Sequence, residues 1–323
     1  MTATATVITV TMNTAIDRVL KAPGFRVGAH LPAETVSHTP AGKGVNLARA
    51  LARLGRSNIA TGFVGQGEAE RFEIFLNTGE GLGRVNNQLL SVRGPTRENI
   101  TVVDPDAGTD THLRTRGYQV TEHDLARLST KVGLLSREGV VFVFAGSSPD
   151  GVDNDALSAL VRKAQWGGAD VVLDLDGKTL GDVLGSVGKA VWMVSPNRSE
   201  FAAALGLDGE MTFEQILDAA RSAADRSGWV MVSMGSEGGL LVTESGVYRG
   251  VCEVDHSRVV STVSSGDCLV AAVVDAHLRG LAPAEALRRG LAVATASTFS
   301  AHPADFDLKD ARELAEAARV EAL

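Results

Sequence analysis

Residues 140–145 read VVFVFA, an unbroken apolar run that ends at the small polar segment 146–148, GSS. A strand with one face in water alternates apolar and polar residues, whereas a strand covered on both faces is apolar throughout. The run therefore predicts a strand in the middle of a mostly parallel sheet, with helices on both faces of that sheet.

Similar β-rich runs recur along the chain, and helical patterns lie between them. The expected strands are Val7–Met12, Asn58–Val64, Val140–Ala145, Asp170–Leu175, Ala190–Val194 and Trp229–Met234. The expected helices are Val45–Leu54, Glu68–Asn77, Glu122–Ser136, Asn154–Gln165, Ser199–Leu205 and Phe213–Ser227. This alternation predicts an α/β fold, and residues 238–250, GGLLVTESGVYRG, add a predicted β-hairpin.

Two polar segments interrupt this rhythm, Asp17–Thr39 and Arg93–Gln119. Both show an alternating, strand-like pattern and lack helical periodicity. They are consistent with a small second sheet inserted into the main domain, and equally with long surface loops. No linker, low-complexity tract or internal repeat is visible, so we expect a single domain over residues 1–323.

The composition bounds the class of protein. The 323 residues are 44% hydrophobic and 22% charged, which is typical of a globular protein, and the net charge of −8 argues against a nucleic-acid partner. The two cysteines, Cys252 and Cys268, form no metal-binding pattern and fit a reducing cytosol. The N-terminus, MTATATVITVTMN, lacks the features of a signal peptide, and no apolar run approaches about 18 residues, so we expect no membrane span.

A late turn, residues 261–272 (STVSSGDCLVAA), joins a polar segment to an apolar one. The segment Cys268–Ala276 is apolar nearly all round, which predicts a buried helix whose first N–H groups and dipole favour an anion. Ser264 and Asp267 have the spacing of a capping box. The same residues could instead form a phosphate cradle, with Asp267 accepting a hydroxyl proton during phosphoryl transfer. The spacing alone does not choose between these interpretations.

An early glycine cluster, residues 40–46 (PAGKGVN), precedes the first expected helix. Gly42 and Gly44 allow the backbone to approach a ligand, and Lys43 supplies a positive charge, although plain turn chemistry also explains two glycines. The spacings of a P-loop and of a dinucleotide-binding turn are both absent. Asn46 is a poor helix former inside the helix, which indicates a function for its side chain.

Seven segments, taken in order, resemble the ribokinase/phosphofructokinase-B superfamily of sugar kinases, and within it the 1-phosphofructokinase and tagatose-6-phosphate kinase branch. The similarity extends from about Val7 to about Ser300. The segments are TMNTAID (11–17), AGKGVNLARALARLG (41–55), PTRENI (95–100), AGSSPDG (145–151), SPNRSE (195–200), VSMGSEGGLLV (232–242) and STVSSGD (261–267). The resemblance implies a ribokinase-like three-layer αβα domain and a small β lid made of residues 14–39 and 93–119. Lids of this kind often pair with a second subunit, so a homodimer through the lid is expected.

The resemblance also implies a role for each matching residue. Asp267 would be the catalytic base, and Ser264, Ser265 and Gly266 would form the anion hole. The sugar phosphate would be bound by Asp17, Gly42, Lys43, Asn46, Arg97, Asn99 and Ser147. The nucleotide would lie against Ser233, Gly235 and Gly238. Asn197 and Glu200 would organise magnesium through water, although the same pair also fits an ordinary N-cap box.

The implied activity is ATP-dependent, magnesium-assisted phosphorylation of a phosphorylated ketohexose, foremost fructose 1-phosphate to fructose 1,6-bisphosphate, in the cytoplasm and without a nucleic-acid or membrane partner. Tagatose-6-phosphate or 6-phosphofructokinase activity is the alternative within the family. A catalytically weak sugar- or nucleotide-binding paralogue is another, because Ser264 replaces the family's glycine and is strained if its φ is positive.

Three further segments depart from the family pattern. Ser261 and Ser195 replace the usual Asn or Asp and the usual Lys. Residues 111–118, THLRTRGY, replace TEINEPGP and introduce Arg114 and Arg116, which favours an anionic partner at the lid and leaves the identity of the sugar open.

Overall fold

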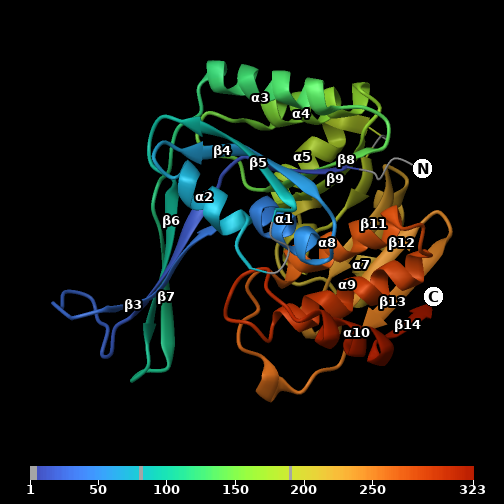
Figure 1. The fold of residues 1–323 in the computed structure, drawn as a ribbon. Helices are drawn as coiled ribbons and strands as arrows, with labels where there is room; N and C mark the ends of the chain where they lie inside the picture. The colour runs from blue at the N-terminus through green and yellow to red at the C-terminus, as the bar shows by residue number, and fades with distance from the viewer. Residues whose placement is uncertain (1–5, 80–82, 189–190) are drawn as a thin grey trace.

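A ten-stranded sheet runs through the molecule between two layers of helices (Figure 1). The computed structural model describes residues 6–79, 83–188 and 191–323. The strand order is β14-β13-β12-β11-β10-β9-β8-β1-β4-β5, parallel from β11 to β5 and antiparallel from β11 to β14. The strands are β1 (Thr6–Thr11), β4 (Asn58–Gly65), β5 (Val85–Val92), β8 (Val140–Gly146), β9 (Asp170–Leu175), β10 (Val191–Val194), β11 (Ser227–Ser233), β12 (Gly239–Thr243), β13 (Gly246–Val251) and β14 (Arg319–Ala322).

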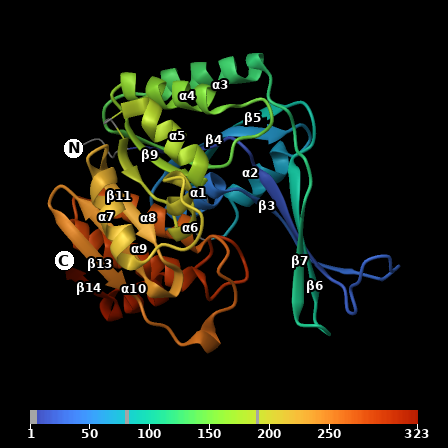
Figure 2. The same cartoon turned by 180° about the vertical axis from the view of Figure 1, so that it is seen from behind.

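Helices cover both faces of this sheet (Figures 1 and 2). One face carries α3 (Glu122–Leu135), α4 (Asn154–Trp166), α5 (Gly177–Val187), α6 (Arg198–Ala204) and α7 (Phe213–Ala224). The other carries α1 (Lys43–Arg53), α8 (Ser265–Leu278), α9 (Pro283–Ser297) and α10 (Leu308–Ala317), and α2 (Ala69–Leu76) packs with α1 against β4 and β5. The predicted three-layer αβα architecture is confirmed.

The run VVFVFA forms β8 and shows why the fold follows from it. Phe142 and Phe144 belong to the core under α3–α7, while Val141, Val143 and Ala145 belong to the core under α1, α8, α9 and α10. Each of these five side chains is at most 2% exposed. Because burial of apolar area is the main favourable term in folding, helices must cover both faces of the sheet to bury the side chains of this strand.

A separate four-stranded sheet, ordered β3-β2-β6-β7, projects from the body (at the left of Figure 1). Its strands are β2 (Ala15–Lys21), β3 (Glu34–Ala41), β6 (Arg97–Asp104) and β7 (Thr109–Arg114). The two polar segments therefore form a second sheet, the lid, and not long surface loops.

The other expected elements occur with ends shifted by a few residues. The hairpin is β12–β13, and the buried helix is α8, in which every residue from Asp267 to Ala276 is buried. Ala190 of the expected strand Ala190–Val194 lies outside the described residues. The elements β5, β14, α5, α9 and α10 were not predicted. Within the described ranges, no helix combines the length and apolar character that a membrane crossing requires.

Candidate active site

The carboxyl ends of the central parallel strands meet the first turns of α1 and α8, where open α/β sheets bind ligands. A cavity of about 340 Å³ lies at this junction, between the main sheet and the lid. The predicted site residues that line it are Asp17, Gly42, Lys43, Asn46, Arg97, Asn99, Asn197, Glu200, Ser233, Ser264, Gly266 and Asp267. The fold thus collects residues from distant parts of the chain around one space.

Asp267 lies in the first turn of α8 and is buried against α1. The side-chain amide of Asn46 donates a hydrogen bond to Asp267 Oδ2 at 2.8 Å, which explains the polar residue inside α1. Burial, together with the neighbouring carboxylate Asp174, raises the pKa of Asp267 to about 8, while the hydrogen bond from Asn46 acts in the opposite direction. A carboxylate with such a pKa can take up a proton near neutral pH.

The capping-box interpretation of Ser264 and Asp267 is wrong. Ser264 precedes α8 in a left-handed conformation, with φ 66°, and its hydroxyl accepts a hydrogen bond from Ala304 N–H at 2.7 Å instead of capping the helix. The strain expected for a serine at this position is therefore present. Of the predicted anion-hole residues, Ser265 uses its N–H for Thr262 O at 3.3 Å. Within the described chain, the N–H groups of Gly266 and Asp267 have no hydrogen-bond acceptor, so they are available to an anion.

Lys43 begins α1 and joins two carboxylates. Its ammonium group lies 3.0 Å from Asp174 Oδ1 and 2.9 Å from Glu200 Oε1. Burial lowers the pKa of Lys43, but the two carboxylates outweigh burial and the net shift is upward. Asp174, in β9, is a site residue that the sequence did not reveal; its signal was a carboxylate between two leucines of the strand DVVLDL, whose other aspartate, Asp170, begins the strand and is exposed.

Asn197 and Glu200 form the N-cap box of α6, as one of the two interpretations predicted. Asn197 Oδ1 accepts from Glu200 N–H, and Glu200 Oε2 accepts from Asn197 N–H, both at 2.9 Å. Since Glu200 also reaches Lys43 and faces the cavity, the cap does not exclude a second function.

The lid supplies the opposite wall. Asp17 in β2 is opposite Asn99 in β6, and the amide of Asn99 donates to Asp17 Oδ1 at 2.7 Å. Burial raises the pKa of Asp17, against the effect of the Asn99 bond. Arg97 Nη2 donates to Asn13 O at 3.2 Å.

Several polar atoms on these walls lack protein partners. In the described part of the molecule, Asn46 Oδ1, Asn99 Oδ1 and Arg97 Nε are buried without a hydrogen bond. Buried polar groups are nearly always paired in folded proteins. Three unpaired atoms around one cavity indicate that a polar ligand completes the site.

A second cavity of about 260 Å³ adjoins the first and shares Ser233, Gly266 and Leu269 with it. It contains the remaining predicted nucleotide-side residues, Gly235 and Gly238, together with Ser265. Gly238 has φ 89°, and a Cβ there would lie 1.9 Å from Gly250 O, so only glycine fits this turn.

Ser147 lies apart from both cavities. It lines neither of them, and its hydroxyl accepts a hydrogen bond from the Asn13 side chain at 3.3 Å. Since Asn13 O also accepts from Arg97, Ser147 contacts the site through Asn13.

The fold and this arrangement define the ribokinase-like class: a mostly parallel sheet, a separate four-stranded lid, and a buried carboxylate between them. The chain aligns with phosphofructokinase-2 from Escherichia coli with a TM-score of 0.87 and 24% identity, covering 97% of this chain and 98% of that one.

Sequence comparison gives the family. A model of the pfkB family carbohydrate kinases matches residues 5–309. The 1-phosphofructokinase of Rhodobacter capsulatus is 34% identical over 289 residues, 88% of each chain. A tagatose-6-phosphate kinase of Staphylococcus epidermidis is 26% identical over 284 residues, 88% of this chain and 89% of the relative. The chain therefore belongs to the pfkB family of carbohydrate kinases, and it is an ATP-using, 1-phosphofructokinase-like enzyme.

Proposed function

We propose that this kinase phosphorylates fructose 1-phosphate to fructose 1,6-bisphosphate. The observation that carries the proposal is Asp267, a buried carboxylate with a raised pKa, at the first turn of a buried helix and in the same cavity as Asp17, Arg97 and Asn99 of the lid. Similarity to the Rhodobacter capsulatus 1-phosphofructokinase favours this substrate over other phosphorylated ketohexoses.

Asp267 acts as the general base. Its ionised carboxylate accepts the proton of the sugar hydroxyl while the hydroxyl oxygen attacks the terminal phosphorus of ATP. The new phosphate ester forms as the bond to the bridging oxygen breaks, and ADP leaves with that oxygen. The free N–H groups of Gly266 and Asp267 stabilise the charge that develops on the transferred group.

The lid and the start of α1 orient the sugar phosphate. Arg97 suits the resident phosphate, because a guanidinium can donate to two phosphate oxygens at once and its Nε has no protein partner among the described residues. Asp17 and Asn99 suit the sugar hydroxyls, because both can accept a hydrogen bond from them: Asp17 through its carboxylate, and Asn99 through Oδ1, which has no partner among the described residues. Lys43 holds Asp174 and Glu200 in place next to the reacting groups.

The residues present fit magnesium bound mostly through water and phosphate. Asp174 and Glu200 offer the hard oxygen ligands that Mg²⁺ prefers, but both already contact Lys43. In the described ranges no group of three or more His, Cys, Asp and Glu residues is arranged to hold a metal by itself. When bound with ATP, magnesium would neutralise phosphate charge. Its water shell would be held by Asp174, Asn197 and Glu200.

The test is ADP release with a panel of sugars: fructose 1-phosphate, fructose 6-phosphate, tagatose 6-phosphate and free fructose. We expect the highest kcat/KM for fructose 1-phosphate. Tagatose 6-phosphate as the best substrate would support the second candidate, which the Staphylococcus epidermidis relative favours. Clean folding without turnover of any phosphosugar would overturn the proposal.

A weakly catalytic paralogue is the third candidate, and the observation behind it is the left-handed Ser264 next to the anion site. A thermal shift caused by ATP or a phosphosugar, without ADP release, would favour it. The panel above separates this candidate from both kinase candidates.

The lid is also proposed to join two copies of the chain. Val36 on β3 and Leu113 on β7 are 60% and 50% exposed on the two edge strands of the lid sheet. Exposed apolar residues on an edge strand favour pairing with another chain.

We place the enzyme in the cytoplasm, because it uses ATP and its two cysteines are free.

A further inference from the structure

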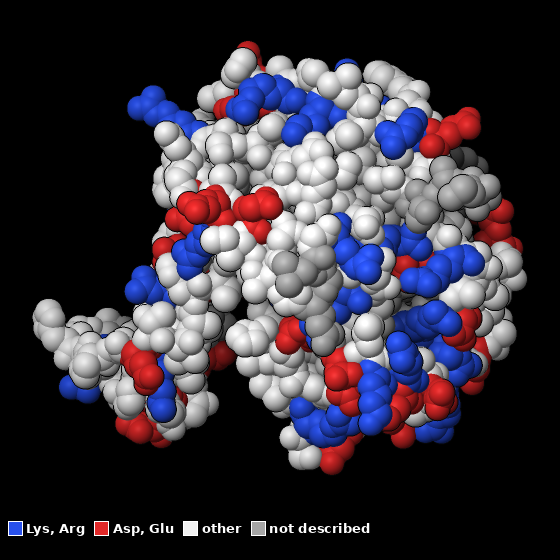
Figure 3. Space-filling view, viewed as in Figure 1, with Lys and Arg blue, Asp and Glu red and all other residues white. Residues whose placement is uncertain are grey.

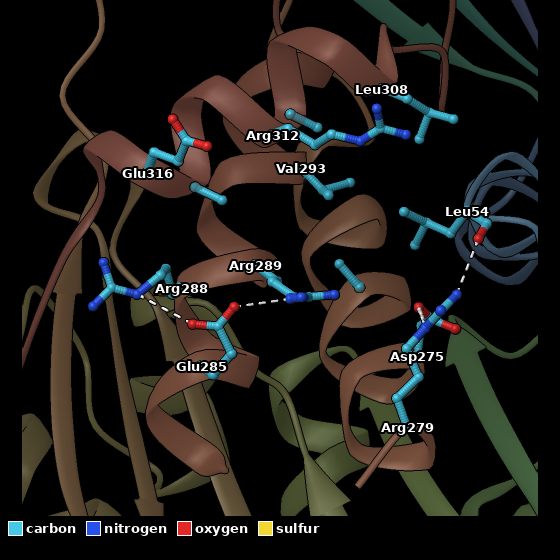
Figure 4. Close-up of a pocket in the computed structure, with 13 residues that line it drawn as sticks. Leu54, Asp275, Arg279, Glu285, Arg288, Arg289, Val293, Leu308, Arg312 and Glu316 are labelled. Carbon is cyan, nitrogen blue, oxygen red and sulfur yellow. Dashed lines mark hydrogen bonds and ion pairs between the residues drawn. The ribbon is translucent and has the colours of Figure 1, made fainter. Parts of the chain in front are cut away.

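A second large cavity lies away from the active site. It has a volume of about 690 Å³, against about 340 Å³ at Asp267, and the two cavities share no lining residue. It lies between α8, α9 and α10, at the end of α1 (Figure 4). It is lined by Leu54, Ala272, Asp275, Arg279, Glu285, Arg288, Arg289, Val293, Leu308, Ala311, Arg312, Ala315 and Glu316.

Arginines outnumber carboxylates in this cavity. Glu285 is shared by Arg288, at 3.3 Å, and Arg289, at 2.9 Å. Asp275 is likewise shared by Arg279 and by Arg56 behind it, each at 2.6 Å. Each of these carboxylates therefore faces two guanidinium groups. Glu316 also lines the cavity, so its four arginines exceed its three carboxylates by one positive charge.

Arg312 adds a further cation. It is exposed on α10, and no residue within the described ranges makes an ion pair or hydrogen bond with it. Arg289 uses only its Nε for Glu285, so its terminal nitrogen atoms also remain without an acceptor in this part of the chain. In Figure 4 both side chains extend over the cavity, from α9 and from α10. In Figure 3, Lys and Arg lie among Asp and Glu at the lower right of this face, in a molecule whose net charge is −8.

The remaining wall is apolar, formed by Leu54, Val293 and Leu308 with several alanines. A volume of about 690 Å³ is within the range of small-molecule sites and leaves room for an organic group beside an anion. A phosphate group suits the cationic side better than a carboxylate, because its several oxygens can accept from guanidinium groups that approach from three helices. The ligand class is thus a small phosphate monoester with an apolar body.

We propose that this cavity, here called the arginine cavity, binds a small organic phosphate at a site separate from the active site. Two helices connect the sites. α1 begins at Lys43 and is followed by Leu54 in the arginine cavity. α8 carries Asp267 at one end and Asp275 near the other, and Arg279 directly follows it. Asp275 is eight residues along α8 from Asp267, about 12 Å at 1.5 Å per residue. The inference does not depend on which sugar the active site phosphorylates.

The test is a calorimetric titration of the full chain with phenyl phosphate, with benzyl alcohol as the uncharged comparison. Wild type is compared with Arg312→Gln and Arg289→Gln in the arginine cavity, with Arg97→Gln in the active site, and with Arg221→Gln. Arg221 is an exposed arginine on α7 and makes the matched control, because its replacement changes the net charge equally outside both sites.

We expect wild type to bind phenyl phosphate and not benzyl alcohol. Loss of one charge-assisted contact should weaken binding about tenfold in Arg312→Gln and in Arg289→Gln. Arg97→Gln and Arg221→Gln should retain this binding. Without the probe, Arg312→Gln should keep the wild-type kcat and KM, since Arg312 lies outside the active site.

Three results would overturn the proposal: no binding of phenyl phosphate to wild type, equal binding of benzyl alcohol, or weakening of less than threefold in both arginine-cavity variants. Loss of binding in Arg97→Gln alone would also overturn it, because the active site would then hold the probe. None of these results affects the sugar-kinase proposal, which is tested by turnover.

Discussion

Asn46→Ala should shift the pH dependence of catalysis upward. Asn46 donates at 2.8 Å to Asp267 Oδ2 in a buried environment, and this bond favours the ionised carboxylate. A hydrogen bond to a charged group contributes about 1.5–3 kcal/mol, and one pKa unit corresponds to about 1.4 kcal/mol. Removal of the amide should therefore raise the pKa of Asp267 by about 1–2 units from its value of about 8.

The sign of the effect follows from the role of the base. Only ionised Asp267 accepts the hydroxyl proton, so kcat/KM rises with pH through the pKa of Asp267, and the whole rise should move to higher pH in Asn46→Ala. At pH 7 the fall would be about 10- to 100-fold for a shift of 1–2 units. Much of this loss should be regained near pH 10.

The assay is kcat/KM by coupled ADP release from pH 6 to pH 10. Asn99→Ala is the matched control, because it removes an amide from the same cavity without touching Asp267. The control should raise KM and leave the pKa of the profile unchanged. An Asn46→Ala profile that is uniformly lower, with its pKa within about half a unit of wild type, would refute the reasoning.

The remaining predictions concern stability, charge and assembly. Ser264→Gly should leave the free energy of unfolding nearly unchanged, because relief of the left-handed strain offsets the lost bond to Ala304; Ser264→Ala keeps the strain, loses the bond and should cost about 1 kcal/mol, both measured by urea unfolding. Lys43→Met leaves Asp174 and Glu200 without their shared cation and should lower both kcat and the urea midpoint. Wild-type values of both quantities would contradict the proposed role of Lys43. In the folded protein Asp267 keeps its proton up to about pH 8, whereas in the unfolded chain it loses the proton near its ordinary pKa of 3.8, so the free energy of unfolding falls as pH rises between these values. The Tm of Asp267→Asn should therefore exceed that of wild type by a margin that grows from pH 5 to pH 8. A constant difference would contradict this prediction. Leu113→Asp should convert a lid-paired dimer to monomers in sedimentation, with an unchanged dimer as the contrary result.

The arrangement of the main sheet could be predicted because its strands carry strong signals. β8 is apolar at nearly every position, and the structure uses alternate residues for the two cores. Elements whose sequences carry only weak signals were not predicted. β5 reads VNNQLLSV at the edge of the sheet, and α5 contains three glycines, which are poor helix formers.

The site could be predicted where a motif gave a residue, and less well where function depends on contacts between distant segments. Lys43 and Asp174 are 131 residues apart, so nothing in the local sequence pairs them. The spacing of Ser264 and Asp267 fitted a cap and a catalytic turn equally. The positive φ of Ser264 and the contact of Asp267 with Asn46 exclude the cap, and both depend on tertiary structure.

The most direct test of the central claim is single-turnover phosphorylation of fructose 1-phosphate by Asp267→Asn, with binding of ATP and of the sugar measured on the same sample. If Asp267 receives the hydroxyl proton, the rate should fall by about 10²- to 10⁴-fold while both ligands bind as in wild type. A variant that binds both ligands and turns over within about threefold of wild type would contradict the assignment of Asp267 as the base.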